Sequence, residues 1–179
     1  MADYKLLYAP NPIFSQIAKP VAAVDEGVKE LVQAMYREMY AHQGVGIGAN
    51  MVGALDRVVV VDLSGDDSSN PMTFNNPEIT WTSEETQVFE EGSLSFPGIA
   101  AKVTRPKAIK VSYLDIDGKH QEMEAEGGLA TVIQHEVDYL NGIVFLDHIS
   151  RLKRDSLLKK MKKFKDKNHI DCKHHHHHH

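Results

Sequence analysis

A six-residue stretch in the second half of the chain has the residue types and spacing of a hydrolytic metal site with one ligand replaced. The stretch reads Gln134-His135-Glu136-Val137-Asp138-Tyr139. In the pattern H-E-x-x-H, two imidazoles four residues apart share one helix face and bind zinc, while the Glu polarises the metal-bound water. His135 and Glu136 match that pattern, but Tyr139 stands at the second ligand position. On this stretch alone, a hydrogen-bonded His-Glu pair on an amphipathic helix is the simpler explanation.

Length and composition favour one soluble globular unit. The chain has 179 residues, of which 42% are hydrophobic and 25% are charged, as in ordinary globular domains. We predict a domain over residues 1–169, followed by a tail and a purification tag over 170–179. The single cysteine, Cys172, excludes an internal disulfide. No apolar run approaches the length that spans a membrane, and the first residues show no signal-peptide pattern. We therefore expect a cytoplasmic protein, or one of an organelle matrix in a eukaryote, with no membrane partner.

Charge is distributed unevenly along the sequence. The net charge is −5, yet the segment 151–167 has nine Lys or Arg residues against Asp155 and Asp166, so it carries +7 and the remainder carries −12. A basic helix on an acidic body can serve as a docking surface. The alternative is a solvated lysine face on a packed helix.

Hydrophobic periodicity predicts the elements that must position these residues. Helices are expected after Asp25, over the stretch that begins near Leu129, and from about Ser150 to Lys167. The predicted strands are Arg57–Leu63, short segments around 72–74, 78–81 and 86–89, a hairpin of 108–114 with 120–125 around Asp117-Gly118, and 143–146. The sequence therefore predicts an α+β fold, in which short and mostly antiparallel strands pack around the central H-E-x-x-H-type helix, with a C-terminal helix.

Three stretches, in this order, resemble the peptide deformylase family. They are Gly44-Val45-Gly46-Ile47-Gly48-Ala49-Asn50-Met51, Glu91-Gly92-Ser93-Leu94-Ser95 and 134–139, and the family's motifs are G-x-G-x-A-A-x-Q, E-G-C-L-S and Q-H-E-x-D-H. The resemblance extends over 4–164. It implies a metal-dependent hydrolase that removes the N-formyl group from the formyl-methionine of nascent peptides.

The same resemblance identifies the positions at which this chain departs from the family. The family's metal ligands are the Cys of the second motif and both His of the third, which correspond here to Ser93, His135 and Tyr139. Ser and Tyr hydroxyls are neutral at pH 7 and are poor donors for a divalent metal. Met51 replaces the Gln that donates a hydrogen bond to the developing oxyanion, whereas Glu136 and the backbone N–H of Leu94 keep the matching catalytic positions.

The peptide-binding half of the family's site is better preserved. The resemblance implies that the substrate backbone pairs as an added strand with Val45, Gly46, Gly92 and Leu94, and that Val132 lines the pocket for the first methionine. Asp138 matches an Asp that lies behind the metal ligands in the family. The alternatives for Asp138 are this functional role and a purely structural one, in which its carboxylate pairs with Arg105 or is a charge on the helix face.

Three functional hypotheses follow from these matches and departures. We expect a chain that is inactive or severely weakened as a deformylase, that holds no cofactor and that binds N-terminal peptides of nascent chains. The alternative is an active hydrolase with a rebuilt site for one divalent metal ion, such as iron or zinc. In a third hypothesis the pocket is vestigial, with Met51 or Tyr139 folded into it. The basic helix adds the ribosome as an expected partner, and DNA is not expected as one.

Overall fold

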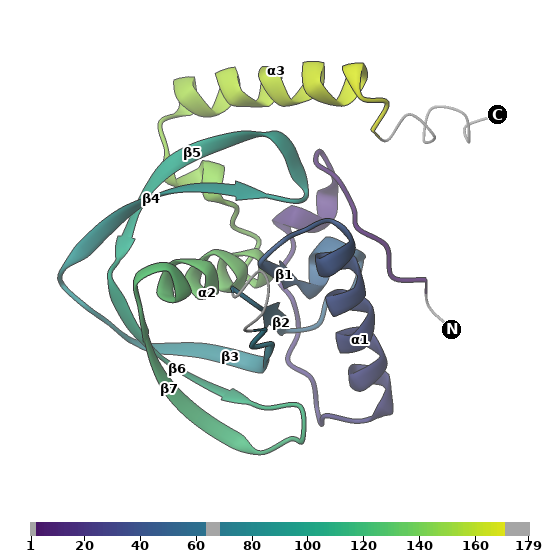
Figure 1. The fold of residues 1–179 in the computed structure, drawn as a ribbon, viewed down its shortest axis with the longest axis vertical. Coiled ribbons are helices and arrows are strands. Elements are labelled where there is room, and N and C mark those ends of the chain that lie inside the picture. Colours follow the sequence, from purple (N-terminus) through teal and green to yellow (C-terminus); the bar gives the residue numbers. More distant parts are fainter. Residues whose placement is uncertain (1–2, 64–68, 171–179) are drawn as a thin grey trace.

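Two antiparallel sheets enclose a central helix in the computed structural model, which describes residues 3–63 and 69–170. A five-stranded sheet has the order β1-β2-β3-β6-β7, and β4 and β5 form a second sheet of two strands. Helix α2 (Gly127–Leu140) lies between the two sheets, as Figure 1 shows. The predicted α+β class is confirmed. The predicted tail lies outside the described residues from position 171 onward, and the extent of the domain stays a prediction.

The other elements follow one another with short connections. The strands are β1 (Gly46–Gly48), β2 (Val58–Val61), β3 (Met72–Thr82), β4 (Thr86–Ser93), β5 (Phe96–Pro106), β6 (Ala108–Leu114) and β7 (His120–Glu126), the remaining helices are α1 (Glu26–Ala41) and α3 (Arg151–Lys167), and the 3-10 helices are η1 (Pro12–Ser15), η2 (Ala49–Val52) and η3 (Phe145–His148). Helix α1 confirms the first predicted helix. As expected, Asp25 caps it, because its side chain accepts a hydrogen bond from the Val28 N–H at 3.0 Å.

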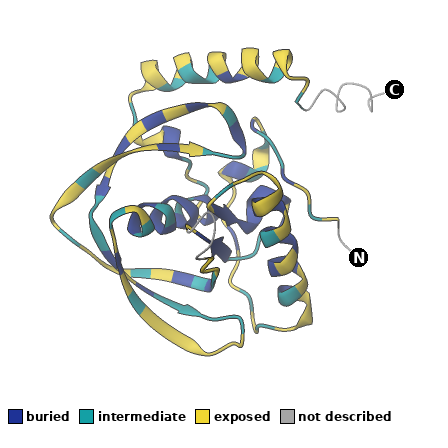
Figure 2. Cartoon of the chain, in the orientation of Figure 1, coloured by how far each residue is buried: buried dark blue, intermediate teal, exposed yellow. Residues whose placement is uncertain are grey.

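Strand β2 explains why the core has two halves. All four of its valines are buried, since both faces of the strand are covered (Figure 2). Val58 and Val60 pack into the cluster that contains the α1 residues Leu31 and Met35. Val59 and Val61 face the opposite side and pack into the cluster built on the apolar face of α2. Successive side chains of a strand point to opposite faces, so a run of β-branched residues suits this position.

Strand β3 differs from the prediction in its length. The sequence suggested separate strands at 72–74 and 78–81, but the structure has one strand of 11 residues. Pro77 lies within it and has no N–H for the ladder. The pairing with β6 shifts its register between Asn75 and Glu78, and Asn76 adopts a positive φ of 51°. This irregularity accommodates the proline, so the strand continues through it.

Strand β5 is absent from the sequence-based prediction. It pairs with β4 along most of its length, and its buried residues alternate with exposed ones from Ile99 to Arg105. Pro97 and Gly98 interrupt the pattern at its start, and the inward position at its end is a charged Arg105 rather than an apolar residue. The alternation was therefore present in the sequence but was obscured at both ends.

Two more predictions near the site require correction. Residues 46–48 were not among the predicted strands, but they form β1 and pair with β2 at the edge of the sheet. Residues 143–146 were expected as a strand, but η3 begins at Phe145. The Asp147 carboxylate accepts a hydrogen bond from the Val144 N–H at 2.9 Å and thereby stabilises this turn.

The C-terminal helix packs on β5 with its apolar stripe. Met161 is buried, and the ring of Phe164 covers Gly98, where an added Cβ would lie 2.3 Å from the ring. Gly98 also has a φ of 80°, which favours glycine. Most basic residues of α3 are exposed (Figure 2), whereas Lys165 is half-buried and donates a hydrogen bond to the Ala9 carbonyl. Across the described residues, 3–63 and 69–170, we find no helix with the length and apolar character required to cross a bilayer.

Candidate functional site

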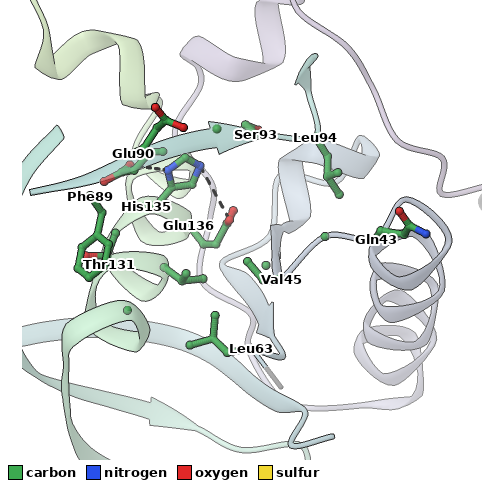
Figure 3. Close-up of a pocket in the computed structure, with 16 residues that line it drawn as sticks. Gln43, Val45, Leu63, Phe89, Glu90, Ser93, Leu94, Thr131, His135 and Glu136 are labelled. Carbon is green, nitrogen blue, oxygen red and sulfur yellow. Dashed lines mark hydrogen bonds and ion pairs between the residues drawn. The ribbon is translucent and has the colours of Figure 1, made fainter. Parts of the chain in front are cut away.

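The three motifs converge on one open cavity of about 460 Å³ between α2, the β1 edge and the β4–β5 hairpin (Figure 3). Every residue predicted to bind a peptide lines this cavity, namely Val45, Gly46, Gly92, Leu94 and Val132. Gln43, Leu63, Phe89, Glu90, Gly128 and Thr131 also line it and were not predicted. Their contribution depends on tertiary contacts that no local pattern reveals.

Gly46 lets the β1 edge approach α2 closely. A Cβ at this position would lie 2.9 Å from both Glu136 Oε2 and Val132 Cγ1. Any larger residue would therefore push against the floor of the cavity. The glycine keeps an extended backbone edge beside the His-Glu pair, which is the geometry that an added peptide strand requires.

His135 is buried on α2, and a hydrogen bond at its Nδ1 fixes the orientation of the ring. Its Nδ1 lies 2.8 Å from Glu91 Oε1. The same carboxylate accepts two hydrogen bonds from Arg105, at 2.7 Å from Nε and 3.0 Å from Nη2. Burial alone would raise the pKa of Glu91, but its hydrogen bonds with His135 and Arg105 lower that pKa below its ordinary value. Glu91 is therefore an ionised acceptor, and the facing His135 Nδ1 carries a proton.

Glu136 lies beside His135 without a comparable partner. Burial raises the pKa of Glu136 to about 7, partly opposed by the neighbouring His135. Burial alone would lower the pKa of His135, but the carboxylates of Glu136 and Glu91 raise it above its ordinary value. Glu136 Oε2 is 4.0 Å from His135 Nε2. Within the described residues, Glu136 Oε1 and His135 Nε2 are both buried and have no hydrogen-bond partner.

Ser93 and Tyr139, at the other two positions that the family resemblance predicts as metal ligands, are hydrogen-bonded to each other. Their hydroxyl oxygens are 2.5 Å apart, and Ser93 Oγ also accepts a hydrogen bond from the Ser95 N–H at 3.2 Å. Tyr139 is fully buried and packs edge-on against Phe14. Burial and the nearby Glu136 raise the pKa of Tyr139 well above its ordinary value, so its hydroxyl stays protonated. Ser93 lines the cavity, whereas Tyr139 does not.

Met51 was predicted from the family resemblance to stand at the position of the oxyanion donor. It is buried in η2, and its Sδ accepts a hydrogen bond from the Gly48 N–H at 3.4 Å. The thioether has no hydrogen to donate. Met51 does not line the cavity either, so neither it nor Tyr139 fills the pocket as the vestigial hypothesis required. Leu94 lies in the turn between β4 and β5, at the rim.

A charged network behind the site was largely missed. Besides holding Glu91, Arg105 donates from Nη1 to Asp138 Oδ2 at 2.9 Å, and His148 Nε2 lies 2.8 Å from that same oxygen. The structure thus contains the Asp138–Arg105 ion pair that the sequence offered as a structural role for Asp138. In the sequence, Glu91 was named only as part of the second motif. A buried acid on one strand and an inward-pointing Arg on the next would have indicated an ion pair between them.

Comparisons with known proteins identify the family. The profile described as polypeptide deformylase matches residues 3–155. A Rickettsia conorii protein named peptide deformylase-like is 56% identical over 160 residues, covering 89% of this chain and 87% of that protein. Peptide deformylase of Mesorhizobium japonicum is 49% identical over 164 residues, covering 90% and 93%. The chain therefore belongs to the polypeptide deformylase family.

Solved structures agree with this assignment. A peptide deformylase from Legionella pneumophila superposes with a TM-score of 0.88 at 39% identity, covering 95% of this chain and 99% of that one. An Ehrlichia chaffeensis peptide deformylase in complex with actinonin gives a TM-score of 0.85 at 36% identity, covering 92% and 99%. Members of the family are hydrolases of protein biosynthesis that use a divalent metal ion.

The donor set of this chain does not fit that metal. A catalytic zinc site ordinarily has three protein ligands with nitrogen, thiolate or carboxylate donors. Here two of the three ligand positions carry protonated hydroxyls that bond to each other. In the part of the chain that the structure describes, no group of three or more His, Cys, Asp or Glu side chains is placed to hold a metal ion.

Proposed function

We propose that this chain binds the N-terminal segment of nascent peptides and has little or no deformylase activity of its own. The observation that carries the proposal is the Ser93–Tyr139 hydrogen bond, which occupies two ligand positions while the adjacent cavity stays open. A metal ion lowers the pKa of a bound water from 15.7 to about 7. Without good ligands that activation is lost, and Met51 removes a donor worth about 10² to 10³ in turnover.

The alternative, an active enzyme with a rebuilt metal site, requires Tyr139 to act as a phenolate ligand. The raised pKa of Tyr139 and its bond to Ser93 oppose ionisation. The binding surface, in contrast, retains each position that the family uses for the peptide backbone. We propose that the partner is the emerging N-terminus of a cytoplasmic nascent chain.

A pocket-filling substitution tests this proposal. Val132→Phe should weaken binding of a fluorescent peptide with an N-terminal methionine by at least about tenfold, because the added ring occupies the space for the first side chain. Val88→Phe is a matched control, since Val88 is exposed on β4 and does not line the cavity. The measurement is fluorescence anisotropy on tag-free protein, together with an assay of formate release. Formate release from formyl-Met peptide as fast as in an intact deformylase would contradict the proposal.

We also propose that α3 docks on the ribosome. Lys159, Lys160, Lys162 and Lys163 are exposed on a helix whose apolar stripe is already packed on β5. Binding to phosphate-rich RNA should fall steeply with added salt. Reversal of these four lysines to Glu should abolish co-sedimentation with ribosomes, whereas reversal of the exposed Lys102 and Lys119 should not. Equal co-sedimentation of both variants would refute this docking role.

A further inference from the structure

One stripe of α2 lines the cavity, and it begins at a glycine. Residues spaced three or four apart lie on one face of a helix, and the residues of α2 that line the cavity follow this spacing: Gly128, Thr131, Val132, His135 and Glu136. From His135 to Gly128 the stripe runs back two turns, or roughly 10 Å, toward the N-terminus of the helix. The cavity therefore continues well beyond the His-Glu pair and past Val132.

Gly128 differs from two other glycines of this cavity in what surrounds it. An added Cβ would lie 2.5 Å from the Leu94 side chain at Gly44, and 2.9 Å from the Val132 side chain at Gly46. A Cβ at Gly128 would meet no neighbouring element within 4 Å in the part of the chain that the structure describes. Glycine is also a weak helix former, and this one lies within α2. Packing does not require a glycine here, and its consequence is open space at this end of the cavity.

An aromatic side chain forms the wall of the cavity near that space. Strand β4 runs beside the stripe, because Gln87 Nε2 donates to Thr131 Oγ1 at 3.0 Å and Glu91 Oε1 lies 2.8 Å from His135 Nδ1. Phe89 lies midway between Gln87 and Glu91 and on the same face of the strand, since alternate residues share a face. Its side chain is 40% exposed and lines the cavity. Figure 3 shows Phe89 and Thr131 at the same end of the cavity.

We propose that Gly128 determines the specificity of this cavity, and that it admits peptides whose first side chain is aromatic and larger than methionine. This inference rests on the proposed peptide-binding function, in which Val132 lines the pocket for the first side chain. An indole or phenyl ring that passes Val132 enters the space at Gly128 and lies against the Phe89 ring, and aromatic pairs gain more than their buried area alone provides. A methionine has no ring for this contact and leaves part of the space without packing partners.

Four fluorescent peptides that differ only in their first residue test this preference. All carry an N-formyl group, so that the charge at the N-terminus is constant, and they begin with Trp, Phe, Met or Ala. Binding to tag-free protein is measured by anisotropy. The Trp peptide should bind at least about fivefold more tightly than the Met peptide, with the Phe peptide between them. The Ala peptide should bind most weakly, because it buries the least apolar surface.

A matched pair of glycine variants locates the preference. Gly128→Leu should reduce the ratio of Trp-peptide to Met-peptide affinity by about fivefold, because the leucine occupies the space that the ring would fill. Gly27→Leu is the control, since Gly27 is the second residue of α1 as Gly128 is of α2, and it is exposed and does not line the cavity. Phe89→Leu should weaken binding of the Trp peptide more than that of the Met peptide, which separates the ring contact from simple apolar burial.

The possible results distinguish this inference from the function on which it rests. Equal or tighter binding of the Met peptide by the parent protein overturns the inference but leaves peptide binding intact. A Trp-to-Met ratio that Gly128→Leu leaves unchanged overturns the role of Gly128, provided that circular dichroism shows a folded variant. Gly128→Ala, which adds a single carbon, provides the same test if the leucine variant does not fold. If none of the four peptides binds, the proposed function itself is overturned.

Discussion

The triple variant Met51→Gln, Ser93→Cys, Tyr139→His is expected to bind about one zinc ion per chain and to release formate from a formyl-Met peptide at least about 10³ faster than the parent. A thiolate and two imidazoles provide three strong ligands and leave one position for water. His135 is already oriented by Glu91, and Glu136 lies beside it. Gln at position 51 should contribute about 10² of the gain through its amide donor.

The three changes should act as a unit. Ser93→Cys alone, or Tyr139→His alone, leaves two strong ligands and should restore little. The measurements are elemental analysis of tag-free protein, because six consecutive histidines bind metals themselves, and a coupled assay of formate. His135→Ala in the triple background is the control and should remove the metal. A parent protein with one metal per chain, or one as fast as the repaired variant, would refute the view that this site has lost its chemistry.

Arg105→Met is expected to destabilise the folded state by about 3 to 5 kcal/mol, which is the usual effect of leaving a buried charge without its partner. Arg105 is 5% exposed and bonds to both Glu91 and Asp138. Its loss leaves the Glu91 carboxylate ionised in the core with only His135 beside it. Urea unfolding at neutral pH measures the change.

Two further variants make this result specific. Lys102 is exposed on the same strand, so Lys102→Met should change the free energy of unfolding by less than about 0.5 kcal/mol. The double variant Arg105→Met, Glu91→Gln removes the unpaired charge and should recover a substantial part of the loss. If the single Arg105 variant were as stable as the Lys102 variant, the network would contribute nothing to folding.

The elements with strong local signals could be predicted from the sequence, and they are the ones that build the framework. Helix α1 has a capping Asp and a regular apolar stripe, and the β6–β7 hairpin has Asp117-Gly118 at its turn. In contrast, the run through Pro77 continues as a strand only because β6 accommodates a register shift. Near the end of strand β5, Arg105 points inward, and its burial is explained only by its hydrogen bonds to Glu91 and Asp138, which the sequence does not reveal.

The same distinction applies to the site. The motifs located many of the residues that line the cavity, and the departures from them were visible at Ser93, Tyr139 and Met51. What the two new hydroxyls do was not visible, because Ser93 and Tyr139 are 46 positions apart and meet only when α2 lies against the β4–β5 hairpin. The sequence likewise could not show that the fold leaves His135 Nε2 and Glu136 Oε1 without a hydrogen-bond partner among the described residues.

The 2.5 Å contact between Ser93 and Tyr139 also constrains how this chain could acquire the family's ligand residues one at a time. A sulfur atom at position 93 is too large for that contact, so the first reversion there would crowd a packed tyrosine without creating a site. Reversion at position 139 alone would replace a large buried ring with a smaller one, leaving a void beside Phe14 and an unmatched serine hydroxyl. We therefore expect each single change to disturb the packing around position 139, and the two residues to be exchanged together more easily than one at a time.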